Sequence, residues 1–273
     1  MDTQAHPQGR SLWHQIHRSA LFDISQFLIL MAAIIWFFAA GTEKLGYNWQ
    51  WYQVPRYIFP LDESGLRAGP LWEGLMVTLR ISGVSLILAL AIGLTTALLR
   101  LSNAFVAQGI ARVYLETIRN TPLLIQLFFI YFVLGPVLGI SRMTSAILAL
   151  SLFEGAYASE IFRAGMVSIH RGQWEAAHSL GLSSFDTYVY IILPQAIRRV
   201  LPPLTSQAIS LVKDSALVST IAIYDLTMQA QAVIAETFLT FELWFTVAAM
   251  YLAVTVTMSI VVSIMEHRFD GVS

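Results

Sequence analysis

Apolar residues gather in long runs along this chain, and short polar segments separate the runs. A membrane-spanning helix needs about 20 mainly apolar residues, because unpaired backbone groups cannot be left in hydrocarbon. Six runs are long enough, so we expect about six transmembrane helices. They cover residues 21–40, 74–99, 111–134, 144–163, 204–224 and 243–265. The fifth run contains Gln207, Lys213 and Asp214, so it either faces protein and water or is shifted out of the bilayer core.

The composition also indicates an integral membrane protein, since 56% of the 273 residues are hydrophobic and only 12% are charged. No stretch forms the basic surface, interleaved with aromatic residues, that a nucleic-acid-binding protein would show. The chain has no cysteine, which excludes disulfides, thiol catalysis and thiolate metal sites. Its six histidines follow no metal-ligand spacing. We therefore expect membrane lipid around the protein, with no metal site and no nucleic acid partner.

Basic residues in short loops predict the orientation. In a zigzag of six helices, most of the arginines fall on one side, which is expected to be cytoplasmic together with both termini. These residues are Arg10, Arg18, Arg100, Arg112, Arg163, Arg171, Arg198, Arg199 and Arg268. The first run lacks a clear cleavage site, so it is predicted to be an uncleaved helix rather than a signal peptide. The predicted organisation is a cytoplasmic tail (1–20), an additional transmembrane helix (21–40), a periplasmic loop (41–70) and a transmembrane domain (71–268).

A polar segment at about 164–203 interrupts the apolar runs on the cytoplasmic side. It contains Glu175-Ala176-Ala177, then, after three intervening residues, Gly181, and then, after nine more, Ile191-Ile192-Leu193-Pro194. We expect a short helix from Glu175, with the acidic residue near its N-terminus, a left-handed stop at Gly181, and a second helix that Leu193-Pro194 ends. The small side chains of Ala176 and Ala177 would allow close approach by a partner.

This spacing resembles the EAA loop of permease subunits in bacterial ATP-binding-cassette (ABC) importers. Further segments resemble the polar amino acid permeases, the group that includes the histidine and glutamine systems, so that the resemblance covers about residues 70–268. The segments are LETIRNTPLLIQLFFIYF (115–132), EGAYASEIFRAGMVSI (154–169), GQWEAAHSLGL (172–182), ILPQAIRRVLPPL (192–204) and LVKDSALVSTIAIYDL (211–226).

The resemblance implies an all-α membrane protein with the type I ABC importer (MetI-like) fold that forms half of a dimeric pore. It implies three kinds of partner: a dimer of ABC ATPase subunits, a second permease subunit that is identical or similar, and a periplasmic amino acid-binding protein. ATP and magnesium would bind the ATPase, because this chain has no GxxxxGK[ST] loop and no cofactor is expected in it. The residues implied to couple to the ATPase are Glu175, Ala176, Ala177, Gly181, Ile191, Leu193 and Pro194.

Charged and polar residues inside the apolar runs are candidates for a substrate path, because burying them in a membrane is costly. Glu154 has no obvious local partner; the ammonium group of an amino acid could supply one, and so could Arg80. Glu160 can instead pair with Arg163 three residues on. The other candidates either line the path or make ordinary contacts between helices; they are Gln126, Tyr157, Lys213 and Asp214.

These observations predict the permease subunit of an ATP-driven, binding-protein-dependent importer that carries a polar amino acid across the bacterial inner membrane. It would not be an enzyme itself. The alternative is an ion-coupled secondary amino acid transporter, which would predict internal repeats and broken helices at matching positions; neither is evident in the sequence. A membrane hydrolase would need a nucleophile facing a base, and Ser159 beside Glu160 gives no such arrangement.

Overall fold

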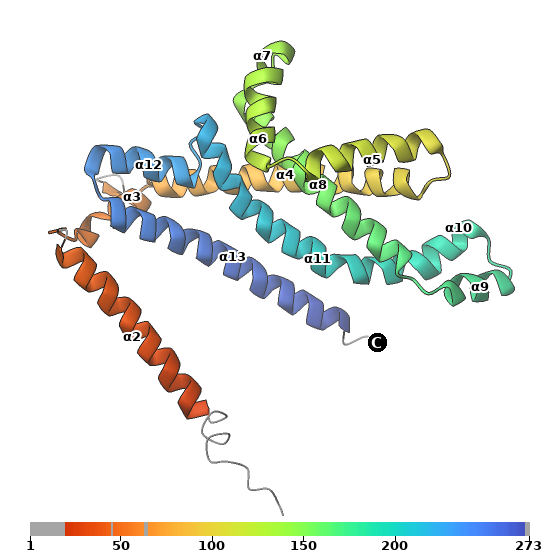
Figure 1. Cartoon of the computed structure of the whole chain (residues 1–273), viewed down its shortest axis with the longest axis horizontal. Coiled ribbons are helices and arrows are strands. Elements are labelled where there is room, and N and C mark those ends of the chain that lie inside the picture. Colours follow the sequence, from red (N-terminus) through yellow and green to blue (C-terminus); the bar gives the residue numbers. More distant parts are fainter. Residues whose placement is uncertain (1–19, 45, 63–64, 271–273) are drawn as a thin grey trace, which may run out of the picture. The chain divides into compact units, whose positions relative to one another are not determined.

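The computed structural model describes residues 20–44, 46–62 and 65–270, and this part of the chain is almost entirely helical (Figure 1). The predicted all-α class is confirmed. A two-stranded antiparallel hairpin is the one sheet among the described residues. In chain order the elements are α2 (Ala20–Lys44), η1 (Trp51–Gln53), α3 (Pro55–Ile58), β1 (Leu61–Asp62), β2 (Gly65–Leu66), α4 (Pro70–Leu101), α5 (Phe105–Arg119), α6 (Leu123–Phe128), η2 (Phe129–Leu134), α7 (Gly135–Leu138), α8 (Arg142–Val167), α9 (Arg171–Ser179), α10 (Ser184–Asp186), η3 (Thr187–Ile192), α11 (Leu193–Asp214), η4 (Ser215–Ile221), α12 (Leu226–Thr237) and α13 (Thr240–Asp270).

The chain divides into two compact units between Gln50 and Trp51. The described part of the first unit contains α2, which is long and apolar enough to cross a membrane over Phe22–Gly41 and covers the first predicted run. The second unit begins before the predicted boundary at residue 71, because the segment from Trp51 to Gly69 folds onto the start of α4. Gly69 donates its backbone N–H to the carbonyl of Ile58 at 2.8 Å, and a Cβ atom at Gly69 would lie only 2.5 Å from the carbonyl oxygen of Tyr57.

Helices α4 and α8 form the most extensive helix pair of the second unit. They approach closely because glycines occupy the contact. A Cβ atom at Gly93 would lie 2.7 Å from Cβ of Ala158, and one at Gly155 would lie 2.9 Å from Cγ2 of Ile92. Small residues allow this approach in a membrane, where helices associate through van der Waals packing rather than through the hydrophobic effect. The pair therefore forms the rigid centre on which the other helices pack.

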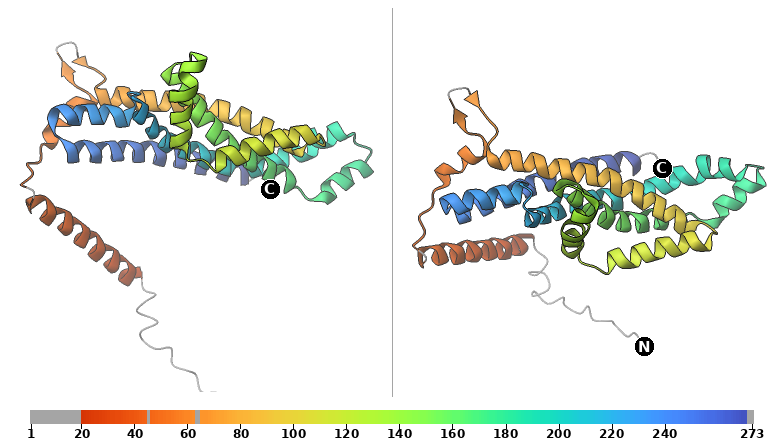
Figure 2. Two further views of the ribbon diagram at one scale, coloured as in Figure 1. Left: turned by 45° about the horizontal axis from the view of Figure 1, so that its top comes forward. Right: turned by 90° about the horizontal axis from the view of Figure 1, so that it is seen from above.

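Two apolar cores hold the remaining helices to this centre. One core joins α4 and α8 to α6, α11 and η4, and its fully buried side chains include Ile81, Leu150, Leu211 and Val218. The other joins the start of α4 to α12 and α13, with Leu71, Leu226, Leu239 and Leu243 fully buried. Both views of Figure 2 show α12 beside the first half of α4, and α13 packs against α12 and α11.

The run at 111–134, predicted as one spanning helix, is broken in the structure. The structure breaks this run into α5 and the α6–η2–α7 segment, and the two parts meet at 106° (Figure 1). The break falls at Thr121-Pro122, because proline has no N–H to donate and its ring disfavours a helical conformation at the preceding residue. The side-chain amide of Gln126 donates to the carbonyls of Ile118 (2.7 Å) and Thr121 (2.8 Å), which compensates for the lost helical bonds.

The prediction for residues 204–224 is wrong in its boundaries. Pro194 does not end a helix, because η3 passes directly into α11 at Leu193 and the helix continues beyond the proline. The helix continues through η4 and stops at Ala222, whose φ of 56° is left-handed. A bend of 48° then leads into α12, which the apolar pattern did not predict. Asp225 begins α12 by accepting the N–H of Met228 at 2.9 Å.

Four described helices are long and apolar enough to cross a membrane by themselves, and the number rises to six if each bent pair counts as one span. About six spans were predicted, so the count agrees with the upper figure. Figures 1 and 2 place the polar hairpin of α9 and α10 at the end of the second unit where α4 ends and α5 begins, away from α3 and α12. The hairpin therefore lies beyond the apolar part of the bundle.

Candidate functional site

The turn between α9 and α10 is fixed by backbone hydrogen bonds. The N–H of Leu182 donates to the carbonyl of Ala177 (3.1 Å), and the N–H of Gly181 donates to that of His178 (3.0 Å). This pair of bonds is a Schellman motif, in which the residue after the helix cap adopts a left-handed conformation. Gly181 has a φ of 77°, as the sequence predicted. The spacing between Ala177 and Gly181 is thus the spacing that a Schellman motif requires at the end of α9.

The hairpin presents apolar side chains to its surroundings. Leu180 is 81% exposed and Phe185 is 74% exposed, although α9 is otherwise polar. Ring contact between Trp174 and Tyr188, with centroids 5.0 Å apart, holds α9 against η3. Large exposed apolar groups on a polar element are typical of a surface that binds another protein.

The residues of the predicted coupling motif have different environments. Glu175 is exposed and pairs with Arg171 at 3.4 Å, but it is the fifth residue of α9, so the predicted position near the helix N-terminus is wrong. Ala177 is only 3% exposed and packs inside the hairpin, whereas Ala176 faces outward. The small-residue surface expected from both alanines therefore comes from Ala176 alone. Ile191 is half-buried, and Leu193 and Pro194 are exposed at the start of α11.

A cluster of polar groups surrounds Glu154 in the interior of α8. Glu154 is 1% exposed, and its Oε2 atom accepts a hydrogen bond from the side-chain amide of Gln207 on α11. Asp214 at the end of α11 is close enough to interact with Glu154, and Lys213 interacts electrostatically with Asp214. The Oε1 atom of Glu154 has no hydrogen-bond partner in the described part of the chain. The cluster thus contains a buried acceptor that a donor could still satisfy.

The other predicted path residues lie apart from this acceptor. Arg80, one of the predicted partners of Glu154, is exposed on α4 and forms no ion pair with it. The side-chain partner of Glu154 is Gln207 instead. The side-chain amide of Gln126 donates to two backbone carbonyls at the break between α5 and α6. This favours a structural role for Gln126 over a role in the substrate path. Tyr157 packs against Phe153 and lies under the guanidinium of Arg119, 5.9 Å from the ring centroid.

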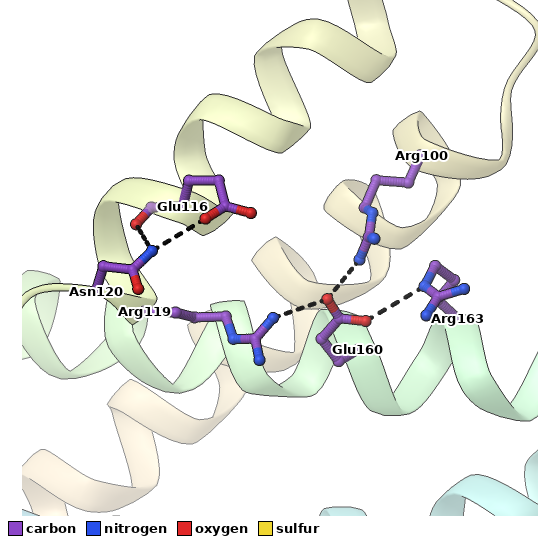
Figure 3. A network of polar contacts seen from close by, with 6 residues as sticks. All are labelled: Arg100, Glu116, Arg119, Asn120, Glu160 and Arg163. Atoms are coloured by element: carbon purple, nitrogen blue, oxygen red, sulfur yellow. Dashed lines mark hydrogen bonds and ion pairs between the residues drawn. The ribbon is translucent and has the colours of Figure 1, made fainter.

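Glu160 joins three helices at one end of the bundle. It binds Arg100 from α4 at 2.7 Å, Arg119 from α5 at 3.0 Å and Arg163 from α8 at 3.2 Å (Figure 3). The predicted pair with Arg163 is present, and the two arginines from other helices were missed. Arg119 lies 41 positions and Arg100 lies 60 positions before Glu160, so no local sequence pattern connects them with it. The only sequence signal for these ion pairs was the number of arginines near predicted helix ends. Charged hydrogen bonds of this kind are stronger than neutral ones.

No group of three or more His, Asp or Glu side chains in the described part of the chain could hold a metal ion. None of the side chains described above forms a nucleophile–base pair. What the geometry offers is a buried polar cluster within the bundle and an exposed apolar hairpin at its end, and neither requires covalent chemistry.

Comparison with known proteins identifies relatives of the second unit. Residues 89–271 match the family described as "Binding-protein-dependent transport system inner membrane component". The chain is 41% identical over 201 residues to the glutamine transport system permease protein GlnP of Escherichia coli (strain K12), which covers 72% of this chain and 92% of that protein. These matches cover the region of the hairpin and of the buried cluster.

Solved structures share the same fold. One described as the crystal structure of an amino acid ABC transporter with histidines superposes with a TM-score of 0.69 at 37% identity, covering 73% of this chain and 94% of the other. An inward-facing structure of the MetNI methionine ABC transporter gives a TM-score of 0.61 at 20% identity, covering 72% and 95%. The second likeness concerns the fold alone.

Proposed function

The chain belongs to the family of binding-protein-dependent transport system inner membrane components, and on this premise we propose that it is the permease subunit through which an ABC importer moves a polar amino acid across the inner membrane. The similarity to a glutamine permease and to an amino acid transporter solved with histidines supports an amino acid as the cargo. It leaves open which amino acid is carried, because the two comparisons name different ones.

The hairpin of α9 and α10 couples the permease to a separate ATPase dimer, which binds ATP and magnesium. The observation that carries this proposal is the exposure of Leu180 and Phe185. Both residues belong to the polar hairpin, which lies at one end of the helix bundle (Figure 1). A few buried apolar anchors supply most of the binding energy in protein interfaces. Arginines at this end of the bundle favour a cytoplasmic position for the hairpin and for both termini.

The amino acid passes close to Glu154. Every amino acid carries an ammonium group, and the Oε1 atom of Glu154 is a buried acceptor with no partner among the described residues. A buried acceptor left without a donor costs about 1–3 kcal/mol. An ammonium group in transit would satisfy this acceptor and would remove that cost. Recognition of the common ammonium group, not of the side chain, leaves selectivity to the periplasmic binding protein.

One permease chain forms half of a pore, and a second permease subunit, identical or similar, supplies the other half. A periplasmic binding protein delivers the cargo on the outside, and ATP binding closes the ATPase dimer on the inside. Coupling requires that the nucleotide and the cargo each bind the inward-open and outward-open states unequally. The broken helices found here would also suit an ion-coupled transporter. Family membership, rather than helix geometry, favours the ATP-driven mechanism.

Reconstitution tests the proposal directly. This chain is placed in liposomes with its ATPase and second permease, binding protein is added outside and ATP inside, and uptake of a panel of radiolabelled amino acids is measured. We expect uptake that needs both additions. Uptake driven by an ion gradient without ATP would overturn the proposal in favour of secondary transport.

Two variants test the hairpin: one tests its binding to the ATPase, and the other tests its coupling of ATP hydrolysis to transport. Leu180→Ser combined with Phe185→Ser should lower co-purification of the ATPase at least tenfold, because two exposed apolar anchors are lost. Glu175→Gln should leave the complex assembled and reduce the amino acid carried per ATP hydrolysed. Normal ATPase binding by the double variant, with normal uptake, would contradict the docking role of the hairpin.

A further inference from the structure

An arginine-rich notch lies beside the Glu160 network, and neither amino acid transport nor ATPase docking uses it. The notch has a volume of about 260 Å³ and is bounded by the ends of α4 and α8 and by one face of α5. Its charged residues are Arg100, Arg112, Glu116, Arg119, Glu160 and Arg163. Four positive charges face two negative ones, so the notch carries a net charge of about +2.

One arginine of the notch has no partner among the residues that the structure describes. Arg100, Arg119 and Arg163 are held by Glu160, whereas Glu116 accepts a hydrogen bond from Asn120 at 3.0 Å. Arg112 is exposed on α5 and makes no hydrogen bond or ion pair with any residue that the structure describes. A guanidinium in this position has all of its donors available, and its planar fork matches the oxygens of a phosphate group.

The surroundings of the notch are apolar. Leu101 lines the notch and is 38% exposed, and Phe105, two helical turns before Arg112 on the same side of α5, is 89% exposed. On α4, Leu98 is also exposed, one turn before the end of a candidate membrane span. The ends of spanning helices lie at the level of lipid headgroups. A positive notch at this level, flanked by apolar faces, has the chemistry of one molecule that is anionic at its head and apolar in its tails.

We propose that the notch binds the phosphate headgroup of an acidic phospholipid, with Arg112 as its free ligand and with the acyl chains along Leu98, Leu101 and Phe105. Arg100 and Arg119 contribute positive charge that Glu160 only partly neutralises. The bound lipid bridges α4, α5 and α8. This inference goes beyond the transport function, because it concerns a lipid site outside the path of the amino acid.

The test measures lipid retention and requires no uptake, so its failure is distinct from failure of the proposed function. The complete importer is purified in neutral detergent and mixed with phosphatidylglycerol or with phosphatidylcholine of the same acyl chains. Native mass spectrometry then counts the bound lipids. We expect preferential retention of phosphatidylglycerol, and about fivefold weaker retention in Arg112→Gln, since one basic residue near a membrane surface contributes about that factor. Arg198→Gln removes the same charge from α11 outside the notch and should retain the lipid like the unchanged protein.

Three outcomes would overturn the proposal. The first is equal retention of the two lipids, and the second is unchanged retention of phosphatidylglycerol in Arg112→Gln. The third is displacement of the lipid by millimolar inorganic phosphate, which would reassign the notch to a soluble anion. Thermal unfolding of Arg112→Gln should match that of the unchanged importer, because this side chain has no partner in the described chain.

Discussion

The buried cluster around Glu154 and the hairpin of α9 and α10 depart from the expected polarity in opposite directions. Glu154 is a charged type of residue placed in the interior of a membrane helix, where it is 1% exposed. Leu180 and Phe185 are apolar residues placed on a polar hairpin, where most of their surface is exposed. Buried polar groups and exposed apolar groups are the informative exceptions in a protein structure.

Each exception indicates a different kind of partner. The buried acceptor of Glu154 fits the proposed passage of a small molecule that donates a hydrogen bond inside the bundle. Exposed apolar side chains on a projecting hairpin require a large surface that removes them from water. The proposed cargo contact and the proposed ATPase contact therefore lie in different regions of the chain, and mutations can test each of them independently.

The largest effect is expected at Glu154. Replacing it with alanine removes the proposed partner of the ammonium group, and the loss of about 2 kcal/mol corresponds to roughly 30-fold slower uptake. Glu154→Gln keeps the shape and one carbonyl acceptor, so its uptake should fall less. Uptake by both variants is measured in proteoliposomes at equal protein level, with ATPase binding as the control for the hairpin. Normal uptake by Glu154→Ala would remove this residue from the path.

A smaller effect is expected at Glu160, which lies on the same helix but has three charged partners. Glu160→Gln leaves Arg100, Arg119 and Arg163 without a counter-charge, and we expect a loss of about 1–2 kcal/mol in stability, because the side chain is only partly exposed. Thermal unfolding measures this loss, which should shrink at high salt. Glu116→Gln is the matched control, since Glu116 is exposed and its carboxylate bonds only Asn120 among the described residues. Equal melting temperatures for the two variants would mean that the network contributes nothing to stability.

The smallest effect is expected at the turn of the hairpin. Gly181→Ala places a Cβ atom on a residue with a φ of 77°, which costs about 1 kcal/mol and disturbs the position of Leu180 and Phe185. We expect ATP hydrolysis to continue while the amino acid transported per ATP decreases. Gly109→Ala on α5 is the control, because that position is helical and a Cβ atom there meets nothing within 4 Å. Identical coupling in the two variants would show that the left-handed turn does not matter.

Local chemistry made much of the fold predictable. The length of the apolar runs predicted helices near residues 21–40, 74–99, 144–163 and 243–265, because hydrocarbon permits few other structures. Gly181 was predictable as a left-handed stop, since glycine adopts the left-handed conformation after a helix end more readily than other residues. The breaks at Pro122 and after Ala222 were missed, although proline gave a signal for the first and Asp225 gave a capping signal for the start of α12.

The sequence by itself determined a helical membrane protein, the position of its polar hairpin and its likeness to amino acid permeases, because these depend on residues that are neighbours along the chain. Only the tertiary structure decided that Gln207 meets Glu154 and that Glu160 collects arginines from α4 and α5. Such partners lie tens of residues apart in sequence. Such contacts depend on how the helices pack, including the 106° angle between α5 and the α6–η2–α7 segment and the glycines between α4 and α8, and no local pattern of apolar and polar residues contains that information.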